Sequence, residues 1–239
     1  MLSGGPLRGT STLLIGPAGS GKTNLALQYV AAACSRGERA VIYQFDERVG
    51  TLLKRSALLG HPLEPYVDDG LLELRQLDPA EISPGEMAAL VRHAVQTRQV
   101  RLVVIDSLAG YLAAMPQEQH LVLQLHELLA YLNQQGVTTF LLNTQQSLVG
   151  SMSVPNLNVS YLADAVLLLR FFESEGRIRK AVSVLKNRGG GHENTIRELR
   201  IDEQGLRIGG VLDRFTGILT GVPTYTGHAG ALLEERGAA

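Results

Sequence analysis

The sequence predicts an α/β fold, in which a mostly parallel central sheet is flanked by helices and followed by a C-terminal antiparallel β extension. Strand-like apolar runs alternate with helix-like segments from Thr10 to Leu142, which is the pattern of β-α-β units. The run Leu102–Ile105 is apolar throughout, as expected of a strand buried on both faces. From Ala165 onward the strand-like segments are separated by short turns, which favours antiparallel hairpins.

The elements of the parallel part follow from apolar spacing and from residues that start or stop helices. Gly37 and Gly136 end two helices whose apolar residues recur at helical spacing. Ser83 and Pro84 suit the cap and the first position of another helix. The expected strands are Thr10–Ile15, Arg39–Phe45, Leu71–Leu77, Leu102–Ile105 and Thr138–Leu142, and the expected helices are Lys22–Arg36, Val49–Leu59, Gly85–Gln99 and Glu118–Gln135.

The length of 239 residues suits one domain with a β extension better than two domains. We therefore expect one domain over residues 1–226 and a flexible, small and polar tail over residues 227–239. The first strand follows Met1 almost at once, which predicts a domain cut from a longer protein. The expected strands of the extension are Ala165–Phe171, Arg179–Lys186, Thr195–Ile201 and Leu206–Ile208.

Composition excludes some classes of partner. The net charge of −1 gives no overall attraction to nucleic acid or anionic lipid. There is no apolar stretch long enough to span a membrane and no secretory signal, so we expect no membrane partner. The single cysteine, Cys34, has apolar helical neighbours and is predicted to be an inert core residue. A chain without internal disulfides fits a reducing cytosol, so the expected location is cytoplasmic.

A phosphate-binding loop is the clearest motif of the chain. It matches G-x-x-x-x-G-K-S/T in full, with an apolar strand before it and a helix after it. Its glycines let backbone N–H groups point at phosphates, and the helix N-terminus favours negative charge. Lys22 is expected to reach the β- and γ-phosphates, and the Thr23 hydroxyl to join the Mg²⁺ shell. The expected ATP-binding residues of this loop are Gly16, Pro17, Ala18, Gly19, Ser20, Gly21, Lys22 and Thr23.

Asp106 is the expected acid on the metal side of the site. It directly follows Leu102–Ile105, at the carboxyl end of a strand predicted to be parallel. In that position it would lie beside the phosphate loop and hold Mg²⁺ through water or through Thr23. The alternative is an aspartate that caps a helix, but the nearby phosphate loop favours the metal role.

Asp46 and Glu47 directly follow the strand Arg39–Phe45. Hydrolysis needs a group that orients or deprotonates a water molecule. Two adjacent acids are costly to place beside a triphosphate unless they serve a purpose. Glu47 and Asp46 are therefore the candidates for the catalytic base, with Lys22 as a further catalytic residue. A solvated pair in a loop is the alternative. Asn143 follows Leu142 and is expected either to contact the γ-phosphate of ATP or to cap a loop.

Taken together, these residues resemble the KaiC-like branch of the RecA-like P-loop ATPases. The likeness runs from about Gly4 to Thr224, almost the whole chain. Phe215–Pro223 is similar to the end of the second ATPase domain in tandem KaiC-like circadian clock proteins. The segments that carry the likeness are Gly16–Thr23, Phe45–Glu47, Val104–Leu108, Asn143–Thr144 and Leu185–Gly189.

The resemblance implies a RecA-like P-loop fold and a hexameric ring that binds ATP between subunits and signals to protein partners of unknown identity. In that family a Lys-x-Arg element and a following His reach the neighbour's nucleotide, and Lys186, Arg188 and His192 match those positions. A guanidinium supplied across an interface can stabilise γ-phosphate charge in the transition state. A basic hairpin on the surface is the alternative.

Clock members of the family also transfer phosphate to a Ser-Thr pair in their second domain. Ser160 matches the serine of that pair, but Tyr161 stands where the threonine would be. Asp46 stands where the clock proteins carry Glu, and a shorter acid lies further from its target. The resemblance therefore leaves two interpretations of Ser160: a phosphate acceptor of a serine autokinase, or a plain serine before a strand.

Two other functions compete with a signalling ATPase ring. One is a RecA-type recombinase or helicase that acts on DNA. Residues 145–160 lie where recombinases bind DNA, and they contain no Lys or Arg, so nucleic acid is an unexpected partner. The other is a non-catalytic ring held together by ATP. The acids Asp46 and Glu47 and the Lys186–Arg188 element argue against such a scaffold.

Overall fold

The strands form one nine-stranded sheet in the described part of the chain, in the order β3-β2-β4-β5-β1-β6-β7-β8-β9. The structure is a computed structural model that describes residues 1–113, 118–145, 159–219 and 223–225. A two-stranded ribbon, β10 with β11, is not part of this sheet, although Phe215 of β10 packs on Phe172 of β6. The strands are β1 (Ser11–Pro17), β2 (Ala40–Gln44), β3 (Leu72–Gln76), β4 (Leu102–Asp106), β5 (Thr138–Gln145), β6 (Ala165–Ser174), β7 (Arg177–Asn187), β8 (Arg197–Asp202), β9 (Gly205–Val211), β10 (Phe215–Thr216) and β11 (Thr224–Tyr225).

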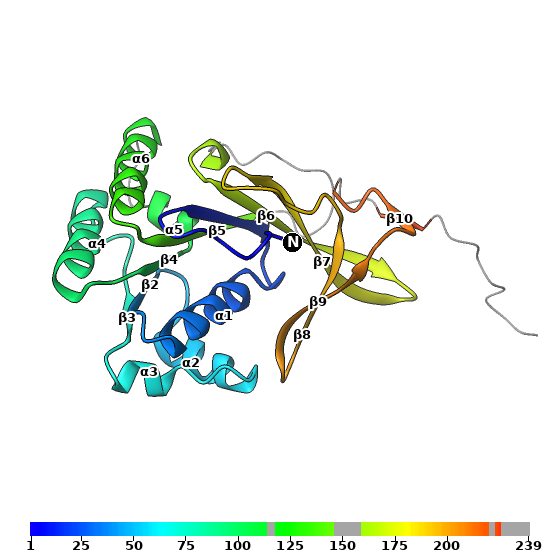
Figure 1. Cartoon of the computed structure of the whole chain (residues 1–239), viewed down its shortest axis with the longest axis horizontal. Coiled ribbons are helices and arrows are strands. Elements are labelled where there is room, and N and C mark those ends of the chain that lie inside the picture. The colour runs from blue at the N-terminus through cyan, green and yellow to red at the C-terminus, as the bar shows by residue number, and fades with distance from the viewer. Residues whose placement is uncertain (114–117, 146–158, 220–222, 226–239) are drawn as a thin grey trace, which may run out of the picture.

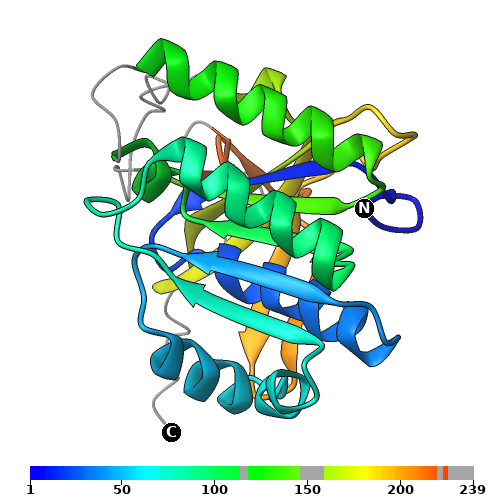
Figure 2. The same ribbon diagram turned by 90° about the vertical axis from the view of Figure 1, so that its left-hand side faces the viewer.

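Helices cover both faces of the parallel part of the sheet (Figures 1 and 2). One face packs on α1, where Leu27 and Val30 meet Leu14 and Val104 of the strands. The other face packs on α4, α5 and α6. The described helices are α1 (Lys22–Ser35), α2 (Val49–Leu58), α3 (Glu64–Asp68), α4 (Pro84–Arg98), α5 (Leu108–Ala113) and α6 (Glu118–Gln134), with a 3-10 turn η1 at Val159–Tyr161.

The predicted α/β fold class is confirmed, and the predicted caps are present. Ser83 caps α4, since its hydroxyl accepts a hydrogen bond from the Glu86 N–H while the Glu86 carboxylate accepts one from the Ser83 N–H. Gly37 and Gly136 follow α1 and α6 with positive φ angles of 78° and 68°. Cys34 is buried as predicted, and this burial raises the pKa of its thiol to about 11.

The β extension differs from the prediction in one respect. Strand β6 was expected within the antiparallel part, but it also pairs in parallel with β1, with Leu14 opposite Leu167. It then pairs antiparallel with β7. The extension is therefore continuous with the central sheet, so the strand that precedes the phosphate loop lies between β5 and β6.

Two short helices, α3 and α5, were not predicted. Each has too few residues to show a helical period, which is the signal that reveals longer helices. Strand β5 continues through Asn143 and Thr144, which were expected to follow it. Among the described helices, none combines the length and the apolarity needed to cross a membrane.

Candidate nucleotide-binding site

The phosphate loop joins the end of β1 to the start of α1. Gly19 and Gly21 have φ angles of 76° and 107°, a backbone conformation that favours glycine. Gly21 is also the N-cap of α1 and has no side chain to satisfy the first N–H groups of the helix. These N–H groups are therefore available to an anion, as the sequence motif predicts.

Lys22 folds back over the loop. Its Nζ donates hydrogen bonds to the carbonyl oxygens of Gly16 and Pro17, each at 2.9 Å. The side chain is buried, and this burial lowers the pKa of Lys22 to about 8, although the nearby Asp106 partly opposes the shift. A triphosphate would offer the ammonium group charged acceptors in place of two neutral carbonyls.

Thr23 and Asp106 come together at the expected metal position. The Thr23 hydroxyl donates to Asp106 Oδ2 at 2.7 Å, and Gln44 Nε2 donates to the same oxygen at 3.4 Å. Burial raises the pKa of Asp106, and these two hydrogen bonds partly offset the rise. A hydroxyl and a carboxylate are the oxygen ligands that Mg²⁺ prefers, so these residues fit the ion. Gln44 was not predicted, because its role depends on Asp106, which is distant in sequence.

The two predicted acids are held by different partners. Asp46 Oδ2 accepts a hydrogen bond of 2.7 Å from the Ser107 hydroxyl, which fixes it next to Asp106. Glu47 Oε2 lies 2.9 Å from Nη2 of Arg55 on α2. Asp46 and Asp106 therefore meet at the same edge of the sheet, while Glu47 is directed to α2. Neither Ser107 nor Arg55 was singled out from the sequence.

Helix α5 presses against the strand end that carries these acids. A methyl group at Gly110 would lie 2.8 Å from Phe45 Cγ and closer still to its Cβ. Gly→Ala in a helix ordinarily stabilises a protein by roughly 0.5–1 kcal/mol. We expect Gly110→Ala to do the opposite, lowering the unfolding free energy by about 1–3 kcal/mol. It should also slow any ATP hydrolysis by displacing Asp46.

Thermal unfolding and steady-state phosphate release check this prediction. Ala109→Ser is the matched control, because Ala109 is the exposed neighbour on the same helix. A Gly110→Ala protein that is more stable than the natural chain would contradict it.

The buried Asn143 lies inside β5, directly opposite Ile15, which precedes the phosphate loop. The loop has two further close neighbours that sequence reasoning missed. A methyl group at Gly21 would lie 2.5 Å from Ile201 Cδ1, and one at Gly19 would lie 3.7 Å from Phe171 Cζ. Ile201 also lines a hollow of about 460 Å³ between β7 and β8, most of whose lining residues are charged.

The phosphate loop has at the opposite end of the strands the element formed by Lys186, Arg188 and His192. Strand β7 runs antiparallel to β6, so its last residues lie beside the first residues of β6 and β1. The Arg188 N–H donates to the Asp164 carbonyl, and the Asp164 N–H donates to the Ser11 carbonyl. Six steps along β1 separate Ser11 from the end of the strand at Pro17, about 20 Å at 3.3 Å per residue.

Lys186 and Arg188 differ in their surroundings. Lys186 Nζ donates to the carbonyl oxygens of Ser160 and Ala163, at 3.0 and 2.6 Å, and so holds the η1 turn. Burial lowers the pKa of Lys186, as does the nearby Arg188. The Arg188 side chain is exposed, and within the described chain it forms no ion pair. His192 is half-buried. Of the segment 145–160, which lies where recombinases bind DNA and was expected not to bind it, residues 146–158 fall outside the described part of the chain.

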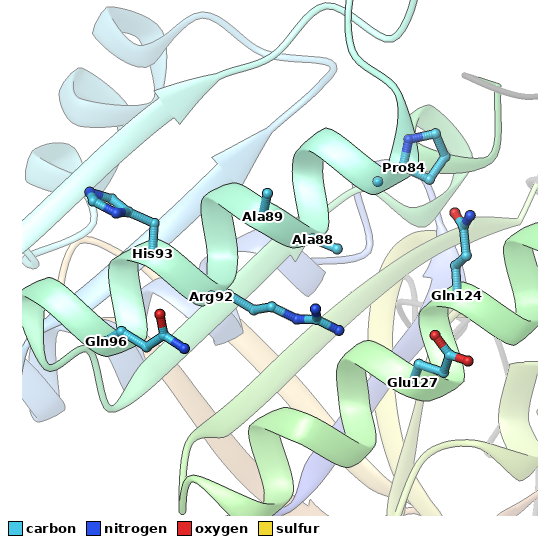
Figure 3. A pocket seen from close by; sticks show the side chains of 9 residues that line it. Pro84, Ala88, Ala89, Arg92, His93, Gln96, Gln124 and Glu127 are labelled. Atoms are coloured by element: carbon cyan, nitrogen blue, oxygen red, sulfur yellow. The ribbon is translucent and has the colours of Figure 1, made fainter.

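A second hollow lies away from the phosphate loop. It measures about 420 Å³ and lies between α4 and α6, where Arg92 is directed toward Gln124 and Glu127 (Figure 3). None of its lining residues belongs to the phosphate loop or to the acids at the ends of β2 and β4. It is therefore separate from the candidate site.

The match to a known protein family agrees with this geometry. The family model described as "ATPase: KaiC" matches residues 1–212. The chain belongs to the KaiC ATPase family. Among KaiC relatives, circadian clock protein KaiC3 of Synechocystis sp. is 27% identical over 231 residues, covering 96% of this chain and 45% of the relative. The circadian clock oscillator protein KaiC of Thermostichus vulcanus is 28% identical over 224 residues, covering 94% and 43%.

The chain thus spans less than half the length of these KaiC relatives, as one KaiC-like domain would. Membership of the KaiC family supports nucleotide binding and ATPase activity in general. The resemblance that the sequence motifs predicted is confirmed.

Proposed function

We propose that this chain binds and hydrolyses Mg-ATP at sites that a neighbouring copy completes, in a ring of six subunits, a number that the family likeness supports. One observation carries the proposal: the phosphate loop and Arg188 lie at opposite ends of the strands of one sheet, about 20 Å apart along the strand direction. If both serve the same reaction, each must act on a different molecule of ATP. The neighbour's nucleotide is then the target of Arg188.

The phosphate loop and its surroundings supply the binding half of the site. The N–H groups of Gly21 and the following residues and the Lys22 ammonium would hold the phosphates. Thr23 and Asp106 would hold Mg²⁺, which would neutralise charge that develops on the phosphates.

Asp46 and Glu47 supply the hydrolytic half. Glu47 would orient or deprotonate the attacking water, and Asp46, held by Ser107, would keep the strand end in place. The exposed guanidinium of Arg188 would meet the γ-phosphate of the neighbour, and His192 lies in the same hairpin. Ser160 shares this end of the strands through Lys186, so phosphate transfer to Ser160 would also have to come from a neighbour's ATP.

Molecular mass in solution, measured with and without Mg-ATP, tests the proposal. We expect the 25.8 kDa chain to assemble into a higher-mass ring with Mg-ATP, and ATP turnover to rise with assembly. Arg188→Met should lower kcat by roughly a hundredfold or more while the chain still binds ATP. Arg214→Met is a matched control, because Arg214 is likewise exposed and, among the described residues, none forms an ion pair with it.

A chain that hydrolyses ATP as a monomer would contradict the shared site. Intact-mass measurement after incubation with Mg-ATP distinguishes hydrolysis alone from transfer to Ser160, which adds one phosphate. Binding to single-stranded DNA at physiological salt would favour the recombinase alternative.

A further inference from the structure

Arg55 on α2 has an incompletely satisfied guanidinium next to the proposed base. Its Nη2 lies 2.9 Å from Glu47 Oε2, and the two side chains are 36% and 20% exposed. Ion pairs between side chains that are as exposed as these add little to stability, because ordering two side chains costs entropy. A stronger anion could therefore replace Glu47 at small cost.

The edge of the guanidinium formed by Nε and Nη2 is buried. Within the described residues neither nitrogen has a hydrogen-bond acceptor, so the contact with Glu47 is one of charge and not a well-aligned hydrogen bond. These two nitrogens form the planar fork that binds two oxygens of a carboxylate or phosphate. Buried donors left unpaired are costly, so the fork indicates an anion with two available oxygens.

Helix α2 lies beside the start of α1, the helix that follows the phosphate loop. Ser56, the residue after Arg55, lines a small void together with Asn24 in the first turn of α1. Asn24 follows Thr23, whose hydroxyl binds Asp106. Glu47 follows Asp46, which is held by the residue after Asp106. Arg55 is thus adjacent in sequence to a residue that faces the first turn of α1, and Glu47 is adjacent to a residue held beside Asp106.

We propose that Arg55 is a phosphate-recognition residue that acts on the nucleotide of its own subunit. Without nucleotide it holds Glu47. When ATP binds, the terminal phosphate takes the fork formed by Nε and Nη2, and Glu47 is released to orient the attacking water. ADP lacks that phosphate and leaves the pair in place. This inference rests on the proposed ATPase function. It adds that Arg55 couples recognition of the terminal phosphate of ATP to the release of the base, Glu47.

The affinities for ATP and ADP test this proposal, measured by titration with fluorescent analogues, together with steady-state phosphate release. The variants are Arg55→Met, Arg55→Lys and Lys54→Met. Lys54 is the matched control, because it is the exposed neighbour on α2 and, of the residues described, none forms an ion pair with it. An ADP affinity unchanged within twofold shows that each variant keeps a folded site.

We expect Arg55→Met to reduce the preference for ATP over ADP about tenfold or more, as the loss of a charge-assisted fork predicts. Its kcat should fall at least as much, because the guanidinium no longer meets the charge on the terminal phosphate in the transition state. Arg55→Lys should recover only part of the preference, since an ammonium keeps the charge but not the fork. Lys54→Met should match the natural chain within twofold.

An Arg55→Met protein that keeps both the ATP preference and kcat would overturn the role of Arg55 and leave the ATPase intact. A natural chain that binds neither nucleotide would overturn both this role and the proposed function. A variant with lower kcat but an unchanged ATP preference would also overturn phosphate recognition, because the fork would then act on Glu47 alone.

Discussion

Replacing Lys22 with methionine is expected to weaken ATP binding about a hundredfold. Methionine keeps an unbranched apolar stem in this buried position but removes the ammonium. In the natural chain Nζ is already directed into the loop, where it binds Gly16 and Pro17 carbonyls. When ATP binds, phosphate oxygens replace these neutral acceptors and form charge-assisted hydrogen bonds with Nζ. Two such bonds contribute about 3 kcal/mol to the binding free energy. Isothermal titration with ATP measures the loss.

The pH dependence of binding gives a second test of Lys22. Because burial lowers its pKa to about 8, the ammonium of the free protein loses its proton as the pH rises through that value. ATP affinity should therefore be highest below pH 8 and fall above it, with proton uptake on binding. Lys22→Met should lack this dependence, and Lys54→Met should retain it. A Lys22→Met protein within threefold of the natural affinity would contradict the role of this residue.

Replacing Glu47 with glutamine is expected to lower kcat by roughly 10²–10⁴, the usual contribution of a positioned general base. The change removes the negative charge but keeps the size of the side chain, and α2 still provides Arg55 beside it. ATP affinity should remain within a fewfold, since the lost carboxylate does not hold phosphate. Single-turnover phosphate release measures the chemical step apart from product release.

Asp46→Asn is the informative comparison for Glu47. An amide at position 46 can still accept the Ser107 hydrogen bond, so the strand end should stay in place and kcat should fall less. Phosphate release that is unchanged in Glu47→Gln would remove Glu47 as the base. A larger loss in Asp46→Asn than in Glu47→Gln would move that role to Asp46.

The parts of the site that sequence could predict are those coded locally. A phosphate loop has fixed spacing within one turn, and Asp106 closes a continuous apolar run, so both are visible without knowing the fold. The long strands and helices are likewise revealed by their periods. The same reasoning cannot find Gln44 or Ser107, since each matters only through a partner about sixty residues away.

The pairing of the strands could not be predicted from the spacing of residues in the sequence. Nothing in the order of residues says that β6 joins β1 in parallel, because that pairing depends on which strand edge is free once β5 has docked. That pairing sets Arg188 at the far end of the strands. Gly110 is a similar case. The structure shows that Phe45 leaves no room for a side chain at this position, and the sequence does not show that these two residues are in contact.

The two opposite ends of the strands have a consequence for stoichiometry. Suppose that each subunit contributes Arg188 at one end of its strands and has its phosphate loop at the other end. An open row of subunits then always has one terminal phosphate loop without a neighbour's Arg188 and one terminal Arg188 without a phosphate loop to act on. Closing the row removes both defects at once, whatever the number of subunits. Closing the ring therefore adds one complete ATPase site per assembly. Loss of a single subunit from a closed ring inactivates the site of an intact neighbour, because that site then lacks its second half.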